Sequence, residues 1–299
     1  MSNPLGLLPI ALAAGGGRID GFETQQLVAA GLTLLQRSAP LVRALSGRRS
    51  SILLPTSPAF VTALAASEGH GAVLINPLAS RFEAAYQIAD ANVGAVFTTT
   101  GLAGRLSDHV ARVLLDDVPR SALVITDGTA RRIDLGSHWG LTLEDEVDVP
   151  GSHEEAAIVY TSGLEGTPLG AILTHANLLS NARATVEAAR IDRHVSALAV
   201  LPFAHLFGLV VSGAAPLLAG GRVTTMERFN AARVVELLEE GGISDLVAVP
   251  SVFATVVALA ERRGKTLRDS ALRLCICGGA PLAVELQDAW FELAGVELR

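Results

Sequence analysis

The sequence is poor in lysine, cysteine and aromatic residues. Lys265 is the only lysine among 299 residues, and the net charge of −7 is mildly acidic. No run of basic residues stands out, so the sequence argues against nucleic-acid binding through a basic patch. Two cysteines, Cys275 and Cys277, are too few for a disulfide framework, and a reducing, cytoplasmic setting is the simplest interpretation. We expect both to be small core residues, and we predict no metal site.

The apolar residues are mainly small and aliphatic. Half of the chain is hydrophobic, but only 4% is aromatic. A composition of Ala, Val, Leu and Ile is typical of buried parallel strands covered by helices. The length suffices for a packed core, in one large domain or two ordinary ones.

Two apolar stretches raise the question of a membrane. Residues 4–14 resemble the apolar part of a signal peptide, but no Lys or Arg precedes them. Residues 196–221 carry no Asp, Glu, Lys or Arg, yet they contain Pro202, His205 and Pro216. A strand, a turn and a buried helix explain this stretch better than one spanning helix. We therefore predict no transmembrane segment.

Strand-like and helix-like segments alternate along the chain. Ser57-Pro58 is typical of a helix start, and Ser80 with Glu83 forms a capping box. The expected strands are 72–75, 93–98, 122–125, 156–161, 197–201, 222–225, 246–249 and 272–277. The main expected helices are 58–69, 80–89, 177–189, 231–240, 251–262 and 282–293. This pattern predicts an α/β fold with mostly parallel sheets flanked by helices.

The middle of the chain suggests a division. Residues 127–155 are richer in charge and glycine, and we interpret them as a surface connection. They separate a first αβ block, residues 1–126, from a second one, residues 156–299. The last residues fall within what resembles an unfinished β/α unit.

The segment from Tyr160 to Gly170 carries the strongest chemical signal. It reads YTSGLEGTPLG and follows a β-branched strand. Its glycines permit tight bends that turn backbone N–H groups inward, and its hydroxyls add donors, which together suit a phosphate site. The spacing of a Walker loop is absent. From these residues alone, an ordinary glycine-rich turn remains the alternative.

Four motifs in order resemble the adenylate-forming superfamily, and in particular its AMP-forming acyl-CoA ligases. Tyr160 to Gly170, followed by LTHANL at 173–178, resembles the phosphate-loop motif of that family. LPTSPAF at 54–60 with GAVLINP at 71–77, LPFAHLFG at 201–208 and LRLCICGGAP at 272–281 resemble three further motifs. The resemblance therefore covers residues 50 to 285 and implies the large N-terminal domain of such a ligase.

The resemblance implies a two-step reaction with ATP, Mg²⁺, a carboxylic acid and coenzyme A. The acid is first adenylated, and a thiol then displaces AMP. The residues implied for the ATP phosphates are Thr161, Ser162, Gly163, Gly166, Thr167 and Gly170. Those implied for the acyl pocket are His205, Phe207 and Gly208, with the charge-free stretch behind them. Those implied for adenine are Gly278, Gly279, Ala280 and Pro281. We also expect a homodimer.

The chain departs from the family in two ways. Leu164 and Glu165 replace hydroxyl residues, and Leu169 replaces a lysine. The later family elements, including the catalytic lysine, do not follow residue 281, so we expect a truncated chain without independent turnover. A non-catalytic acyl- or nucleotide-binding relative is the alternative function. At single residues, a core histidine at 205 and a plain strand-to-helix turn at 278–279 are the alternatives.

Overall fold

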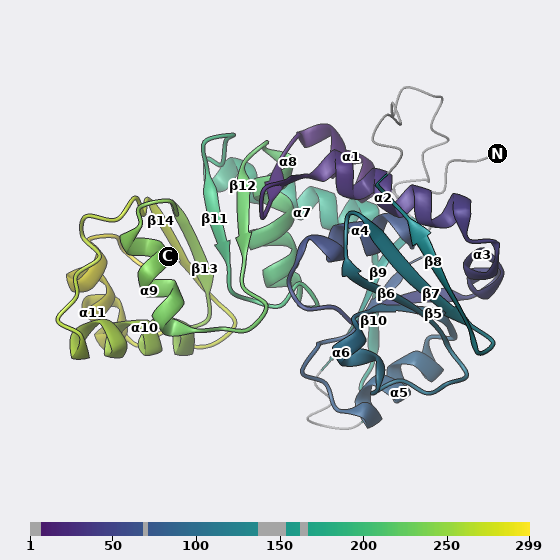
Figure 1. The fold of residues 1–299 in the computed structure, drawn as a ribbon. Coiled ribbons are helices and arrows are strands. Elements are labelled where there is room, and N and C mark those ends of the chain that lie inside the picture. Colours follow the sequence, from purple (N-terminus) through teal and green to yellow (C-terminus); the bar gives the residue numbers. More distant parts are fainter. Residues whose placement is uncertain (1–6, 68–70, 137–153, 162–166) are drawn as a thin grey trace.

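The computed structural model describes residues 7–67, 71–136, 154–161 and 167–299. Helices and strands alternate along the chain, and the strands form two sheets (Figure 1). The helices are α1 (Leu7–Gly15), α2 (Thr24–Arg37), α3 (Ala39–Leu45), α4 (Pro58–Ala66), α5 (Arg81–Asp90), α6 (Thr100–Ala103), α7 (His175–Ala188), the π-helix η1 (Phe207–Ala214), α8 (Ala215–Leu218), α9 (Ala231–Glu239), α10 (Pro250–Arg262) and α11 (Val284–Ala294). The α/β fold predicted from the sequence is confirmed.

An eight-stranded sheet has the order β10-β9-β4-β3-β5-β6-β7-β8. Its strands are β3 (Arg49–Ile52), β4 (Ala72–Leu74), β5 (Val93–Thr98), β6 (Ala111–Asp117), β7 (Ser121–Thr126), β8 (Thr129–Asp134), β9 (Glu155–Tyr160) and β10 (Gly170–Thr174). The five strands from β9 to β6 in this order are parallel. At the two sides of the sheet, β10 is antiparallel to β9, β7 is antiparallel to β6, and β8 is antiparallel to β7. All six residues of β5 are buried, as expected for a parallel strand covered on both faces.

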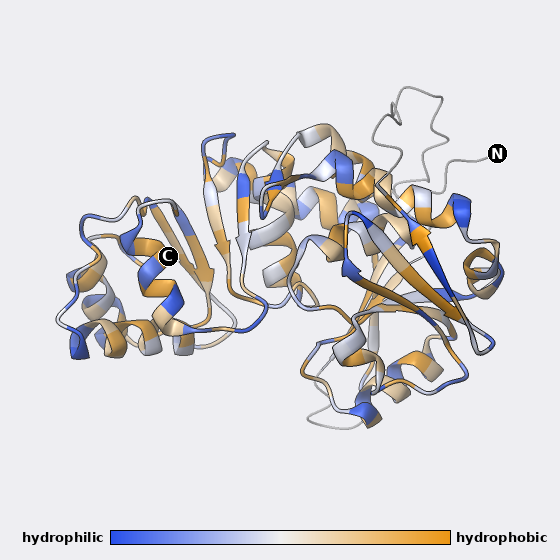
Figure 2. Cartoon of the chain, viewed as in Figure 1, coloured by the Kyte–Doolittle hydropathy of each residue, from blue (hydrophilic) through white to orange (hydrophobic). Residues whose placement is uncertain are grey.

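A six-stranded sheet has the order β14-β13-β11-β12-β1-β2. Its strands are β1 (Arg18–Ile19), β2 (Phe22–Glu23), β11 (Ser196–Ala199), β12 (Arg222–Thr225), β13 (Asp245–Ala248) and β14 (Leu274–Cys277). All of them are parallel except the edge strand β2. Most strands of both sheets take the hydrophobic colour in Figure 2, consistent with burial under helices.

The chain passes back and forth between the two sheets. The N-terminal strands β1 and β2 belong to the six-stranded sheet, while β9 and β10 complete the eight-stranded one. Strand β8 lies inside the segment that we expected to be a connection, and residues 137–153 lie outside the described residues. The predicted boundary at 127–155 therefore does not coincide with the boundary between the sheets, and the division into blocks stays a prediction.

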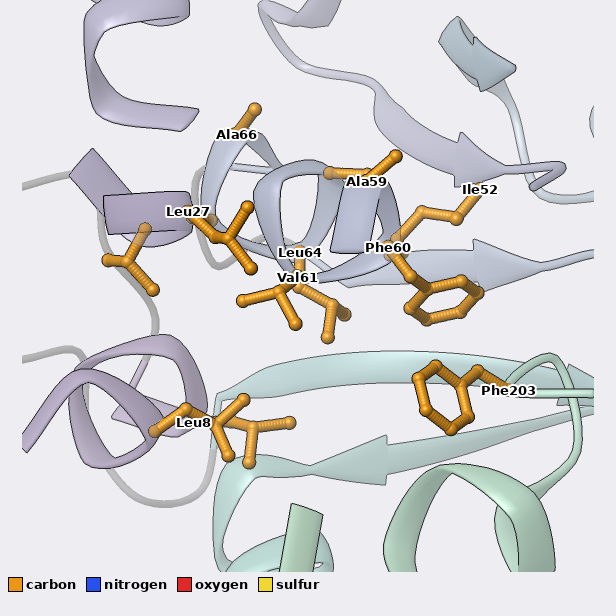
Figure 3. Packing of buried hydrophobic residues seen from close by; sticks show 14 of the residues in the cluster. Leu8, Leu27, Ile52, Ala59, Phe60, Val61, Leu64, Ala66 and Phe203 are labelled. Carbon is orange, nitrogen blue, oxygen red and sulfur yellow. The ribbon is translucent and has the colours of Figure 1, made fainter. Parts of the chain in front are cut away.

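Helices α1, α2, α4, α7 and α8 lie between the two sheets (Figure 1). Their buried residues form one hydrophobic cluster with residues of both sheets. Figure 3 shows Phe60 of α4 and Phe203, which follows β11, facing each other across this layer. Their rings meet edge to face with centroids 5.6 Å apart, and both are almost fully buried. The two sheets thus share a continuous core and not merely a chain connection.

The contact between α2 and α4 depends on Gly31. A Cβ atom at this position would lie 2.6 Å from the carbonyl oxygen of Thr62 and 2.7 Å from Cβ of Ala65. The absence of a side chain therefore lets the two helix backbones approach closely. This contact sits in the layer that separates the sheets.

Most expected elements are present within one to three residues of the predicted bounds. The charge-free stretch forms β11, a turn, η1 and α8, so the prediction of a strand, a turn and a buried helix is confirmed. The described part of the apolar N-terminus forms α1, which buries Leu8 and Leu12. Among the described helices, none is both long and apolar enough to cross a membrane. Cys275 and Cys277 are free thiols. Cys275 is buried in a separate hydrophobic cluster that includes residues of β13, α10 and α11, and Cys277 packs against that cluster.

Candidate functional site

A groove of about 1020 Å³ lies where the carboxyl ends of strands from both sheets meet. Thr56 and Pro58 follow β3, Pro77 follows β4, and Thr99 follows β5. Residues 200–202 follow β11, and residues 226–229 follow β12. Because ligands of open α/β sheets bind outside the carboxyl ends of the strands, this groove is a candidate ligand-binding site.

The predicted phosphate segment begins at the same edge. It connects β9 to β10, a hairpin in which Tyr160 is paired with Gly170. The backbone N–H of Thr161 donates to the carbonyl of Leu169 (3.0 Å), and the N–H of Leu169 donates to Oγ1 of Thr161 (3.1 Å). Thr161 and Thr167 are exposed. Ser162, Gly163 and Gly166, with Leu164 and Glu165, lie outside the described residues.

Helix α5 holds the hairpin in place. Tyr160 donates its hydroxyl to Oδ2 of Asp90 (2.5 Å), and Tyr86 donates to the carbonyl of Pro168 (3.1 Å). The two tyrosine rings meet edge to face, with centroids 6.1 Å apart. Burial, and then the bond to the Asp90 carboxylate, raise the pKa of the Tyr160 hydroxyl. These two tyrosines therefore fix both sides of the loop.

Gly170 is needed for the packing of this hairpin. A Cβ at position 170 would lie 2.9 Å from Cγ2 of Ile158 and 3.2–3.3 Å from the ring of Tyr160. The Tyr160 ring therefore occupies the space that a side chain would fill. Sequence reasoning missed Tyr86 and Asp90, because their partners lie 82 and 70 residues away.

His205 lies in the turn between β11 and η1. Its Nε2 is 2.9 Å from Nδ2 of Asn76, which follows β4. Partial loss of hydration lowers the pKa of the imidazole, although the residue remains exposed. Because β4 pairs with β9, Asn76 and Thr161 leave adjacent strands at the same edge of the sheet. Position 205 is therefore not the fully buried core histidine that the sequence left open.

Phe207 and Gly208 begin the π-helix under close packing. A Cβ at Gly208 would lie 2.4 Å from the carbonyl oxygen of Pro202, and one at Gly213 would lie 3.0 Å from the ring of Phe203. The hydroxyl of Ser212 donates to the carbonyl of Gly208 (2.8 Å). These small residues thus let the helix and the turn approach each other closely. π-Helical turns of this kind are frequent at functional sites.

The predicted adenine segment lies against Phe207. A Cβ at Gly278 would lie 3.1–3.6 Å from three carbons of the Phe207 ring, so the ring rests on the backbone of this residue. Gly279 has a φ of 82°, a conformation that favours glycine. Gly279, Ala280 and Pro281 are exposed. The structure therefore brings the predicted acyl and adenine segments together.

Other motif residues have structural roles. His175, in the motif that follows the phosphate segment, is buried, and its Nδ1 accepts a hydrogen bond from the backbone N–H of Leu8 (3.2 Å). This bond joins the start of α7 to α1.

Within the described ranges, no group of three or more His, Cys, Asp or Glu side chains is placed to hold a metal ion.

Residues 41–298 match the family model described as AMP-binding enzyme. 4-Coumarate–CoA ligase 5 of Oryza sativa subsp. japonica is 30% identical over 254 residues, which are 81% of this chain and 44% of that protein. 4-Coumarate–CoA ligase-like 4 of the same plant is 28% identical over 302 residues, or 96% and 52% of the two chains. The chain thus spans about half the length of these curated relatives.

Solved structures share the fold. The inhibitor-bound N-terminal domain of FACL13 from Mycobacterium tuberculosis has a TM-score of 0.75 at 21% identity, covering 100% of this chain and 75% of that one. ATP-bound MatB from Rhodopseudomonas palustris has a TM-score of 0.73 at 21% identity, covering 97% and 58%. The match over residues 41–298 shows that the chain belongs to the AMP-binding enzyme family, whose adenylate-forming acyl-CoA ligases it resembles in fold and motifs.

Proposed function

We propose that this chain is the nucleotide- and acid-binding part of an AMP-forming carboxylate–CoA ligase. A carboxylate oxygen attacks the α-phosphorus of ATP, and the bond to pyrophosphate breaks. A thiolate sulfur then attacks the carbonyl carbon of the acyl-adenylate, and AMP leaves. The observation that carries this proposal is a series of neighbours at the carboxyl ends of the two sheets. Thr161 and Asn76 leave adjacent strands, Asn76 lies beside His205, and the Gly278 turn lies against Phe207.

The hairpin offers hydrogen-bond donors that suit a polyphosphate. Oγ1 of Thr161 accepts from Leu169, so the proton of that hydroxyl is free to point at a phosphate oxygen. Thr167 offers a second exposed hydroxyl, and we assign backbone donors to Ser162, Gly163 and Gly166 by resemblance. Donors directed at developing charge are the main catalytic resource in such chemistry. Mg²⁺ would accompany the phosphates, and we assign it no protein ligand.

The acid and the thiol take the space on either side of His205. We assign the acyl group to His205, Phe207 and Gly208, and the adenine ring to the 278–281 turn beside Phe207. We assign the arm of coenzyme A to the groove, whose volume is large enough for a ligand of that kind. The free thiols at 275 and 277 favour a cytoplasmic location, and sedimentation of the purified chain would test for a homodimer.

Calorimetry with ATP and with a non-hydrolysable acyl-adenylate analogue tests the proposal. We expect saturable binding of the analogue and weaker binding of ATP, with adenosine alone as the control ligand. Absence of binding by both nucleotides would contradict the proposed function. Binding of the analogue without any binding of ATP would favour a non-catalytic relative.

Leu169→Lys should strengthen ATP binding. Leu169 occupies the position at which the family has lysine, and its side chain is 71% exposed, so a longer charged side chain fits without repacking. A unit charge 4 Å from a phosphate in water-like surroundings contributes about 1 kcal/mol, or about a fivefold gain in affinity. The gain should fall as salt is raised. Leu169→Met, which is long but uncharged, should leave the affinity unchanged; an equal gain in both variants would rule out the electrostatic explanation.

A further inference from the structure

A pair of side chains joins the ends of the two sheets at the site. Asn76 follows β4 of the eight-stranded sheet, and His205 follows β11 of the six-stranded sheet. Nδ2 of Asn76 lies 2.9 Å from Nε2 of His205, a hydrogen-bond distance between two groups 129 residues apart. The protonation of the imidazole is therefore linked to the geometry of Asn76.

The orientation of the Asn76 amide is fixed by its own turn. Oδ1 of Asn76 accepts a hydrogen bond from the backbone N–H of Leu78 (2.8 Å). Arg105 clamps the same turn, since its Nη1 donates to the carbonyls of Pro77 (2.6 Å) and Ala79 (3.1 Å). Rotating the amide by 180° would break the bond to Leu78, so the amide nitrogen faces His205. An amide nitrogen only donates, and Nε2 must then accept.

We propose that Asn76 is a positioning residue that holds His205 neutral, with its single proton on Nδ1. The ring then presents one N–H donor and adds no positive charge to the site. That its donor meets the acid or the thiol rests on the proposed function. The tautomer itself does not, because it is set by contacts within this chain.

No charged group near His205 competes with Asn76 in setting the protonation of the imidazole, within the described part of the chain. The adjoining groove is lined by two arginines and three carboxylates, namely Arg105, Arg228, Asp20, Asp116 and Glu227. Asp20 accepts from the N–H and hydroxyl of Thr225, and Asp116 accepts from those of Thr100. The π-helix that follows His205 has no charged residue. Within the described part of the chain, the imidazole makes no ion pair and has Asn76 as its side-chain partner. Its lowered pKa, caused by desolvation, acts in the same direction.

Nitrogen NMR of the histidine rings across a pH titration tests the proposal on the chain without ligands. His205→Gln identifies the signals of His205 among the seven histidines. In the unsubstituted chain we expect the shifts of an Nδ1-protonated neutral ring. Observation of the Nε2-protonated form, or of an imidazolium at neutral pH, would overturn the proposal. Because no nucleotide or acid is present, this outcome is independent of the calorimetric result.

Asn76→Asp should raise the pKa of His205. One carboxylate oxygen can still accept from Leu78, while the other faces Nε2 and can only accept, so it favours a proton there. A carboxylate at hydrogen-bond distance favours the imidazolium by about one to three pKa units. Asn92 lies at the amino end of β5, at the opposite end of the strands from Asn76. Asn92→Asp makes the same chemical change and should leave the pKa of His205 unaffected. An unchanged pKa of His205 in Asn76→Asp would contradict the inference.

Discussion

Phe203→Ala is expected to lower the free energy of unfolding by about 3–5 kcal/mol, the usual cost of removing a buried phenylalanine. The ring is 2% exposed and meets Phe60 edge to face. It also fills the space beside Gly213, where a Cβ would lie 3.0 Å from it. The cavity would therefore open between α4 and the π-helix, where neither sheet can collapse without moving the other.

Urea denaturation followed by circular dichroism measures this change. Phe291→Ala is the matched control, because that ring is 46% exposed on α11 and its loss should change stability by no more than about 0.5 kcal/mol. The double variant with Phe60→Ala should show a coupling of about 0.5–1.5 kcal/mol, as found for aromatic pairs. A loss of less than about 1 kcal/mol in Phe203→Ala would mean that the two sheets do not share this core.

The strands that the sequence predicts best are those buried on both faces. Residues 93–97 and 246–249 are continuous apolar runs, and this composition is typical of a parallel strand buried between helices. The four motifs also follow strands or begin helices. Their gathering at the carboxyl ends is a consequence of parallel strands, and the alternation of elements already implies it.

Three of the missed strands lack a local pattern. Strands β1 and β2 have two residues each; β1 acquires its structure by pairing with β12, more than 200 positions away, and β2 pairs only with β1. Strand β8 carries Arg131 and Arg132 and is mostly exposed, so it has no buried alternation. The Asn76–His205 bond likewise joins two of the four motifs. The resemblance assigned His205 to the site but gave no role to Asn76. Such pairs depend on tertiary structure, which a single sequence does not reveal.

The replacement of Gly208 by alanine should disturb both stability and site geometry. The added Cβ would lie 2.4 Å from the carbonyl oxygen of Pro202 and 3.1 Å from that of Leu201, so the turn before the π-helix must open. Overpacking of this kind costs about 1–3 kcal/mol. The carbonyl of Pro202 also accepts from the backbone N–H of His205 (3.0 Å), and its displacement would move the imidazole away from Asn76.

Gly104→Ala separates this steric effect from the general cost of replacing a glycine. Gly104 ends α6 with a φ of −65°, and a Cβ there would meet no atom within 4 Å. We expect that control to be neutral or stabilised by about 0.4–1 kcal/mol, since alanine restricts the unfolded chain. Gly208→Ala should in contrast lower the urea midpoint, weaken binding of the acyl-adenylate analogue and change the His205 nitrogen shifts. If it lost stability while the His205 shifts stayed in place, the close approach at Gly208 would serve packing alone and would not position the histidine.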